Sequence, residues 1–455
     1  MKKKITYLGV FVLTVFNTFT QQSILTAQNV TSEPTAIKRK CATPILDESF
    51  ETWIADKIQK QQQFANEKKA VVVYNIPVIF HIIHTGQAVG TNANVSAARI
   101  TQQLNTLNAD YRKLNTDLNT YLTQPSFVAI AADCEINFCL AKVNPTGGVL
   151  TEPGIDRFTV ASKGWSTNPP YTASSSYLEN TVKAGSIWNP VKYFNVWITE
   201  LNGGVLGYAQ FPTVTAGTTP IGDITGFGGA ANTDGVVVDY KYVGLSGATG
   251  GAYNLGRTLT HEAGHWLGLR HIWGDDGSAC SGSDYAADTP NQAGENYTCP
   301  TTNGLVRTDA CSPTSPGVLY QNYMDYSDDR CMVMFTSTQK ARMQSVMANC
   351  IRRNSLNTST VCSIPTGIDE SSSISEVELF PNPSNGELNI MVSLVTNDDY
   401  SITVINTLGQ VIKQLHFSNS NGGKSTLDLS SNSQGVYFVT VKTKSGSKTK
   451  RIIIQ

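Results

Sequence analysis

Charged residues are scarce in this chain, and neither sign dominates. Only 15% of the 455 residues are charged, and 34 Lys and Arg stand against 35 Asp and Glu. Proteins that bind nucleic acid carry a strongly basic surface, so this balance gives no case for a nucleic-acid partner. Long apolar runs are also missing after the N-terminal segment, whereas a transmembrane helix needs about 20 consecutive apolar residues. We therefore predict no transmembrane segment once that N-terminal segment has been removed.

The N-terminus has the pattern of an export signal. The basic run Lys2–Lys4 precedes an apolar stretch, Ile5–Phe19, that is too short to span a bilayer comfortably. Ala27 ends a segment that is typical of a cleavage site. We therefore predict a signal peptide over residues 1–27; the alternative is a retained membrane anchor. An exported chain meets an oxidising compartment, in which disulfides are expected.

The nine cysteines are an odd number, so at least one is unpaired or is paired outside the chain. Cys41 stands alone near the start, whereas the other eight fall into groups. The simplest arithmetic gives eight cysteines with local partners and one outlier. The groups are Cys134 and Cys139, then Cys280, Cys299, Cys311 and Cys331, and then Cys350 and Cys362.

The order of the predicted elements indicates an α/β unit. Helical character occurs at 48–69, 96–114, 254–267 and 337–352. Apolar and β-branched runs predict strands at 71–84, 130–141, 193–200, 205–211 and 235–240. Residues 274–331 are rich in Asp, Gly, Pro and Asn, which predicts an irregular region. This alternation predicts an α/β catalytic unit with a long loop region stapled by disulfides.

A second domain is predicted at the C-terminus. Residues 365–376 form a Ser-rich, acidic linker. Residues 377–455 then show short alternating strands separated by turn signals, which predicts a small all-β sandwich. The expected strands lie at 377–380, 387–392, 400–405, 436–442 and 452–454.

The strongest chemical signal is a motif with three histidines. His261 and His265 are four residues apart in a predicted helix, so both side chains can reach one ion. Gly268 can take a positive φ and break the helix, which lets His271 approach from the other side. Three imidazoles leave a fourth position for water, as a catalytic zinc requires. We therefore predict that these histidines bind zinc; the alternative is a helix with stacked structural histidines.

Three further residues have predicted roles around this zinc. Glu262 adjoins the first ligand and can take a proton from the water and pass it to the leaving amine. The zinc motif resembles that of metzincins, in which a Met in a turn forms the floor beneath the metal. This resemblance implies that role for Met324, against ordinary core packing. Tyr326 can hydrogen-bond the oxyanion as the carbonyl becomes tetrahedral.

Four segments together resemble the pappalysin family of metzincin metalloproteases. They are Thr260–His271, Gly207–Pro212, Asp288–Pro290 and Asn322–Tyr326. The likeness covers about Tyr74 to Arg352, within a catalytic domain predicted over residues 70–364. It implies an upper subdomain with a twisted sheet and a zinc-binding helix, and a loop-rich lower subdomain. It also implies a zinc metalloendopeptidase that acts on proteins or peptides.

The resemblance carries structural features to the loop region. It implies the bridges Cys280–Cys311 and Cys299–Cys331, a pairing that the sequence alone leaves open among three. It also implies structural calcium, for which the oxygen ligands on offer are Asp284, Asp288, Thr289 and Gln292. The alternative for this Asp-rich loop is an ordinary solvated turn.

An acidic residue near the end of the loop region has a predicted role in specificity. In similar bacterial and archaeal family members, an acidic residue two positions before the Cys331 equivalent lines the S1′ pocket. The matching residue here is Asp329, with neighbouring Asp328 as the alternative. A carboxylate pairs with Arg or Lys, so we expect cleavage on the N-terminal side of basic residues.

Residues 28–69 resemble a prosegment. Arg39-Lys40-Cys41-Ala42-Thr43 resembles the family's motif, with Ala42 in place of its Gly. A thiolate is a strong zinc ligand, so Cys41 is expected to occupy the water position and keep the enzyme latent. The alternative is an adventitious free or mispaired thiol. Lys68-Lys69 would suit self-cleavage by an enzyme that prefers a basic P1′ residue.

The C-terminal domain resembles the type A sorting domain of the type IX secretion system. The likeness rests on Leu379–Pro383, Asn385-Gly386, Gly435–Tyr437 and the basic run Lys448–Arg451. It implies the type IX secretion machinery as a partner, passage through the periplasm of a Gram-negative bacterium, and release or display at the cell surface.

Two rival functions fit parts of the sequence. A non-catalytic surface adhesin would have the same β domain and secretion signals, but a structural zinc has no need of Glu262 as a base. A polymer-binding module over 377–455 would need an aromatic platform, whereas the aromatic residues there are scattered. The sequence therefore favours a secreted metalloendopeptidase.

Overall fold

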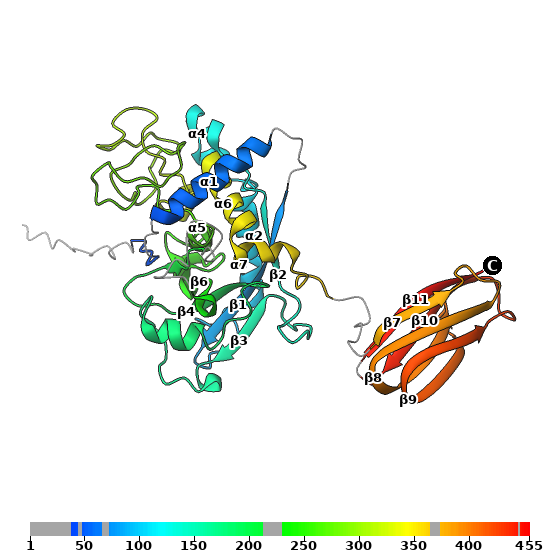
Figure 1. Ribbon diagram of the computed structural model, residues 1–455. Helices are drawn as coiled ribbons and strands as arrows, with labels where there is room; N and C mark the ends of the chain where they lie inside the picture. The colour runs from blue at the N-terminus through cyan, green and yellow to red at the C-terminus, as the bar shows by residue number, and fades with distance from the viewer. Residues whose placement is uncertain (1–37, 44–47, 66–71, 213–229, 365–373, 445) are drawn as a thin grey trace, which may run out of the picture. The chain divides into compact units, whose positions relative to one another are not determined.

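The computed structural model describes residues 38–43, 48–65, 72–212, 230–364, 374–444 and 446–455 (Figure 1). The expected signal peptide, the Lys68-Lys69 site and most of the expected linker lie outside these residues. The remainder forms an α/β domain and a C-terminal β domain, which are described separately below.

A six-stranded sheet forms the centre of the α/β domain. Its order is β2-β1-β4-β6-β5, and β3 pairs with the same side of β1 as β2. The pairings are parallel except that β5 runs antiparallel to β6 at the edge. The bounds are β1 Tyr74–His84, β2 Ile136–Leu140, β3 Ile155–Thr159, β4 Phe194–Thr199, β5 Gly207–Ala209 and β6 Val236–Asp239. The α/β fold predicted from the sequence is confirmed, although β3 was not predicted.

Four longer helices accompany this sheet, and their ends follow local chemistry. They are α1 Glu48–Ala65, α2 Ala97–Tyr111, α5 Arg257–Trp266 and α6 Ser337–Asn349. The Ser96 hydroxyl caps α2 by accepting from the Arg99 amide. Thr336 and Gln339 form a reciprocal capping box at the start of α6. The shorter helices are α3 Leu118–Tyr121, α4 Pro125–Ile130, η1 Ala161–Lys163, η2 Leu178–Lys183, η3 Ala231–Thr233, η4 Tyr240–Tyr242, η5 Gly247–Gly250, η6 Asp329–Cys331, α7 Ile351–Asn354 and η7 Ser355–Thr358.

The main core lies between one face of the sheet and these helices. Strand side chains alternate between faces, so even-numbered residues of β1 such as Val78 and Phe80 enter this core with residues of α2, α5 and α6. Odd-numbered Ile79 and Ile83 belong to separate clusters on the other face. Helix α1, from the expected prosegment, adds Phe50, Trp53 and Ile54 to the main core. Helix α5, which carries His261 and His265, is therefore held between the sheet and other helices.

Three disulfides join the described cysteines, and one expectation about them was wrong. Cys280–Cys311 and Cys299–Cys331 form as the resemblance implied. Cys139 pairs with distant Cys362, and Cys41, Cys134 and Cys350 are free. Strand parity explains the error: Cys134, Ile136 and Phe138 face the main core, whereas Cys139 points to the opposite side of β2. Eight locally paired cysteines do not occur.

The C-terminal domain is an antiparallel five-stranded β structure around its own apolar core. The order is β11-β10-β8-β7, with β9 paired to β8. The bounds are β7 Ile374–Phe380, β8 Glu387–Asn406, β9 Val411–Asp428, β10 Gly435–Thr443 and β11 Gly446–Ile454. Two strands predicted separately belong to the long β8, and β9 was not predicted. The all-β prediction for this domain is confirmed.

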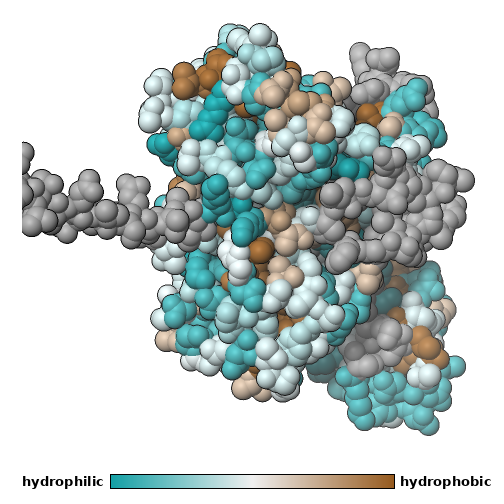
Figure 2. All heavy atoms as spheres, turned by 90° about the vertical axis from the view of Figure 1, so that its left-hand side faces the viewer, coloured by the Kyte–Doolittle hydropathy of each residue, from teal (hydrophilic) through white to brown (hydrophobic). Residues whose placement is uncertain are grey.

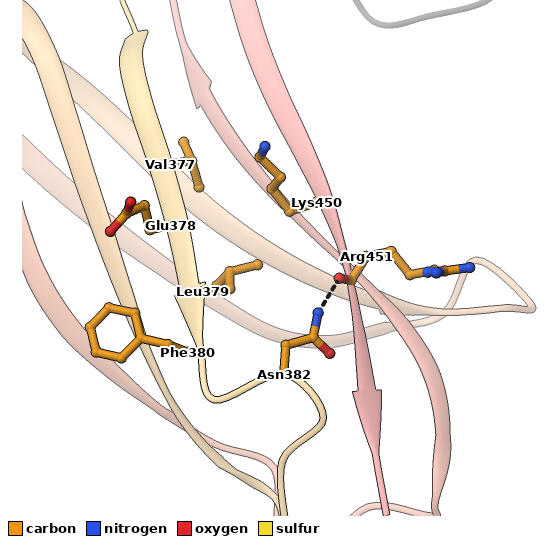
Figure 3. A pocket seen from close by; sticks show the side chains of 7 residues that line it. All are labelled: Val377, Glu378, Leu379, Phe380, Asn382, Lys450 and Arg451. Atoms are coloured by element: carbon orange, nitrogen blue, oxygen red, sulfur yellow. Dashed lines mark hydrogen bonds between the residues drawn. The ribbon is translucent and has the colours of Figure 1, made fainter.

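A shallow pocket of about 420 Å³ opens between β7 and β11 (Figure 3). Leu379 and Phe380 line it from β7, and Lys450 and Arg451 from β11. At one end the Asn382 side-chain amide donates to the Arg451 carbonyl at 2.9 Å. This bond ties the turn after β7 to the last strand.

On the face shown in Figure 2, apolar atoms occur in small groups among hydrophilic residues. In the described part of the chain, no helix combines the length and apolarity needed to cross a bilayer.

Candidate metal centre

Helix α5 and the turn after it position the three histidines. His261 and His265 lie one turn apart on the buried helix α5. Gly268 has a φ of +88°, and a Cβ there would lie 2.9 Å from Val346 Cγ2, so both backbone and space require glycine. The turn closes when the Leu269 amide donates to the Gly264 carbonyl at 2.9 Å. His271 then returns towards the helix, as the sequence predicted.

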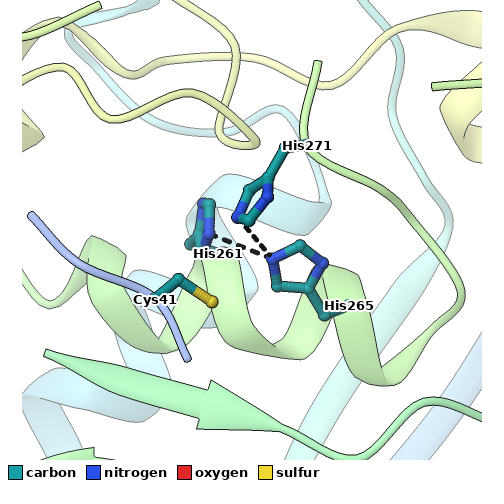
Figure 4. Close-up of side chains that lie close together, drawn as sticks. All are labelled: Cys41, His261, His265 and His271. Carbon is teal, nitrogen blue, oxygen red and sulfur yellow. Dashed lines mark hydrogen bonds between the residues drawn. The ribbon is translucent and has the colours of Figure 1, made fainter. Parts of the chain in front are cut away.

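The three imidazoles converge through their Nε2 atoms. His265 Nε2 lies 3.2 Å from both His261 Nε2 and His271 Nε2 (Figure 4). Each Nδ1 has its own acceptor: His261 donates to the Tyr323 carbonyl at 2.7 Å, His265 to the Leu269 carbonyl at 2.7 Å, and His271 to the Asp275 carboxylate at 2.8 Å. Because the carbonyls can only accept, the Nδ1 atoms of His261 and His265 carry the protons.

This arrangement fits a metal ion better than a hydrogen-bonded cluster. Burial lowers the pKa of both His261 and His265 well below the usual value, so both rings are neutral and their Nε2 lone pairs face each other. Adjacent ligands on a tetrahedral zinc, with Zn–N of about 2.0–2.1 Å, lie about 3.3 Å apart. The spacing matches this value, and second acceptors on Nδ1 are the usual partners of zinc-binding histidines.

Cys41 approaches the same point from a different part of the chain. Its Sγ and one nitrogen of each histidine all lie within 4.8 Å of one another. Figure 4 shows the sulfur pointing towards the imidazoles from a segment outside α5. Burial and the nearby Glu262 carboxylate raise the pKa of the thiol, so a cation among the imidazoles is needed to hold it as the thiolate. Four ligand atoms of types that suit zinc are thus brought together.

Glu262 lies beside the cluster and is held by the same segment. The Thr43 hydroxyl donates to its Oε2 at 3.1 Å, and the Cys41 thiol lies 3.3 Å from that oxygen. Burial raises the pKa of Glu262 to about 7. A Cβ at Gly207, on edge strand β5, would lie 2.9 Å from Glu262 Cγ. Glycine at this position therefore leaves room for the carboxylate against the edge strand.

Met324 and Tyr326, the residues expected to form the floor and to bind the oxyanion, both lie near the three histidines. Met324 is fully buried, and a Cβ at Gly264 would lie 2.5 Å from its Sδ, so Met324 packs directly against α5. The Tyr326 hydroxyl accepts from the Cys41 amide at 3.1 Å and lies 3.3 Å from His271 Nε2. Both residues therefore border the candidate metal centre.

Asp329 is buried and pairs with Arg39, which lies in the expected prosegment. The Arg39 guanidinium donates to its Oδ1 at 2.7 Å, and both side chains have at most 1% of their surface exposed. The Leu255 and Arg257 amides donate to Oδ2 at 2.9 and 3.2 Å. Asp328, the alternative, instead accepts from the Cys299 amide. Of the two neighbouring carboxylates, the structure places Asp329 against a basic side chain.

The four expected calcium ligands are brought together only in part. The Thr289 hydroxyl donates to both oxygens of Asp284, at 2.8 and 2.9 Å. Asp288 instead accepts from Thr336 and Thr338 at the start of α6, and the Gln292 amide donates to Gly294 and Asp325. Burial raises the pKa of Asp284 to about 7. The calcium site stays a prediction.

Sequence reasoning missed three residues at the centre. Asp275, which orients His271, lies four residues beyond it, a spacing that is a usable signal. Arg39 belonged to the recognised prosegment motif but had no assigned role. Thr43 also belonged to that motif, yet its bonds to Glu262 and to the Ala209 amide at 2.8 Å depend on tertiary structure.

Two parts of the chain match known protein families. Residues 177–348 match the family described as Pregnancy-associated plasma protein-A, and residues 378–455 match the family described as Secretion system C-terminal sorting domain.

The chain is similar to two fungal proteins named extracellular metalloprotease. One, from Colletotrichum graminicola, is 29% identical over 71% of this chain and 95% of its own length. The other, from Podospora anserina, is 32% identical over 48% of this chain and 73% of its own length. Among solved structures, Tannerella forsythia mature mirolysin in complex with a cleaved peptide is 39% identical, with a TM-score of 0.53, and covers 64% of this chain and 97% of its own.

Proposed function

Because the chain belongs to the pappalysin family of metalloproteases, we propose that it is a zinc-dependent endopeptidase that is made as a latent precursor and prefers Arg or Lys at P1′. One observation carries the zinc assignment. Three Nε2 atoms converge at the spacing of tetrahedral ligands while each Nδ1 is bonded to its own acceptor.

Each residue around the candidate metal centre has its own role in the proposed reaction. His261, His265 and His271 would hold zinc, which supplies Lewis acidity to polarise the scissile carbonyl and to lower the pKa of water. The Glu262 carboxylate takes the proton from the attacking water and returns it to the leaving amine. The Tyr326 hydroxyl donates to the carbonyl oxygen as negative charge develops there. The carbonyls of Tyr323 and Leu269 keep two of the imidazoles in the tautomer that presents Nε2.

The Arg39–Asp329 pair supports the basic P1′ preference. Asp329 is a buried carboxylate whose Oδ2 is fixed by two backbone amides, which leaves Oδ1 for a guanidinium. The Tyr253 ring stacks against Arg39 at 4.9 Å from its guanidinium carbon. A substrate Arg in the place of Arg39 would meet the same carboxylate and the same ring.

The prosegment contacts support latency. Cys41 lies at the fourth ligand position, Thr43 holds Glu262, and Arg39 takes the proposed S1′ position. A P1′ residue lies C-terminal to the scissile bond, whereas Arg39 lies N-terminal to Cys41. The prosegment therefore runs opposite to a substrate, which explains how it can fill the site without being cut there. Its pairing with β5 is parallel, through a bridge between Cys41 and Gly207.

Two further parts of the proposal concern the protein's surroundings. The sorting-domain match supports export through the type IX secretion machinery of a Gram-negative bacterium, by way of the periplasm. Structural calcium is proposed at Asp284 and Thr289, which contact each other, with Asp288 and Gln292 as further ligands after a local rearrangement.

Digestion of a mixed peptide pool tests the central proposal. We expect the activated protein to cut before Arg and Lys, and we expect phenanthroline and Glu262→Ala each to abolish cutting. Equal cleavage in all three samples would show that neither zinc nor Glu262 is needed and would overturn the proposal.

A further inference from the structure

Helix α1 is attached to the catalytic domain by contacts that the latency proposal does not use. Phe50, Trp53 and Ile54 are at most 1% exposed and belong to the core formed by the sheet and by α5 and α6. Helix α1 therefore does not lie loosely on the surface. Its apolar face is part of the same core as the zinc helix.

A buried carboxylate on α1 occupies a site made of two arginines. Glu51 accepts from Arg270 Nε at 2.8 Å and from Arg342 Nη1 and Nη2 at 2.7 and 3.1 Å. The three side chains are at most 8% exposed. Hydrogen bonds between ionised groups are the strong ones, and a guanidinium that grips both carboxylate oxygens fixes geometry as well. Removing one partner from such a buried set is strongly destabilising.

The same arginines connect α1 to the third zinc ligand. Arg342 Nη2 also donates to the carbonyl of Gly268, the residue that breaks α5, at 3.0 Å. Arg270 directly precedes His271. A Cβ at Gly268 would lie 3.3 Å from the Phe50 ring, so the turn and the helix are in close contact. Helix α1 therefore packs against the segment that carries His271 and helps to fix its position.

We propose that Arg270 and Arg342 form a binding site for the Glu51 carboxylate of α1. We further propose that α1 stays bound to the catalytic domain after the chain is cut between α1 and β1. This inference rests on the proposed latency and extends it. Four residues separate the switch residues Arg39–Thr43 from α1, so a bound helix holds them next to the zinc site at high effective concentration. A single cut in residues 66–71 leaves the enzyme latent, and activity requires a second cut within 44–47 or the loss of α1.

The binding experiment uses the full chain with Glu262→Ala, so that it cannot cut itself. A recognition sequence for an unrelated protease replaces part of 66–71, and the cut protein is followed by size-exclusion chromatography. We expect the N-terminal fragment to co-elute with the remainder. Glu51→Gln keeps the shape but removes the negative charge that both guanidinium groups face, so the fragment should dissociate at least about tenfold faster. Asp56→Asn, on the exposed side of the same helix and paired with Lys60, is the matched control and should not change the rate.

A second measurement avoids any variant that fails to fold. Synthetic peptides of residues 48–65, with Glu51 or with Gln at that position, are added to the cut chain. The Glu51 peptide should displace the fragment at concentrations at least about tenfold lower than the Gln peptide. Immediate loss of the fragment after cutting, or equal potency of the two peptides, would overturn the proposal. Neither readout requires proteolysis, so a failure here is distinct from a failure of the proposed activity.

Discussion

Asp329→Asn offers the sharpest test of substrate recognition. The Asn oxygen can still accept from the amides of Leu255 and Arg257, which turns its amide nitrogen towards the position now held by the Arg39 guanidinium. The Asn amide nitrogen and the guanidinium, both hydrogen-bond donors, then face each other in place of the buried ion pair of 2.7 Å. Breaking such a pair costs about 3–5 kcal/mol, and about 1.4 kcal/mol corresponds to a tenfold change in rate.

The expected result is a loss of at least about a hundredfold in kcat/KM for a substrate with Arg at P1′. A matched peptide with Met at P1′ should change far less, because Met makes no ion pair. Both peptides are assayed as internally quenched fluorogenic substrates with the activated enzyme. Asp328→Asn is the control, since its carboxylate contacts the Cys299 amide instead. An Arg-to-Met ratio that stays the same in Asp329→Asn would refute the assignment, and retained activity on the Met peptide shows that the variant is folded.

Three other perturbations follow from the geometry. Burial raises the pKa of Asp329 above the usual aspartate value, so this carboxyl is protonated at a higher pH than an ordinary aspartate, and the Arg-to-Met ratio should fall as the pH is lowered; a ratio that rises on acidification would contradict this. Cys41→Ala in the uncut chain should give measurable activity where the parent has none, because a thiolate is no longer available to zinc; equal silence of both would exclude the switch. Gly264→Ala places a methyl group 2.5 Å from Met324 Sδ and should lower the free energy of unfolding by about 1–3 kcal/mol, seen as a lower midpoint in thermal unfolding.

Sequence patterns predicted an element correctly where its residues show a regular apolar or chemical spacing. Strand β1 is buried on both faces along most of its length and is largely apolar in sequence. Helix α5 shows its two histidines through their four-residue spacing. Strand β3 contains Asp156 and Arg157, whose side chains hydrogen-bond to His81 and Glu152. The strand therefore lacks the apolar run by which a buried strand is predicted. Strand β9 is largely exposed and polar, and its composition is that of a loop.

The parts of the site that could not be predicted depend on contacts between distant residues. Arg39 and Asp329 are 290 positions apart, and Glu51 and Arg342 are 291 apart. Nothing in the local sequence of either partner identifies the other. The cysteine pairing failed for a related reason, because strand parity directs Cys139 away from neighbouring Cys134, and its partner is 223 positions away.

The Cys139–Cys362 bridge also determines how mechanical load enters the catalytic domain. Cys362 lies just before the segment that leads to the sorting domain, and Cys139 is in β2, hydrogen-bonded to β1. Force applied through the sorting domain passes across the bridge to β2, because the disulfide closes the chain between Cys139 and Cys362 into a covalent loop. Tension along the C-terminal end therefore enters the domain at β2, and the covalent chain between the two cysteines, which carries His261, His265 and His271, is bypassed.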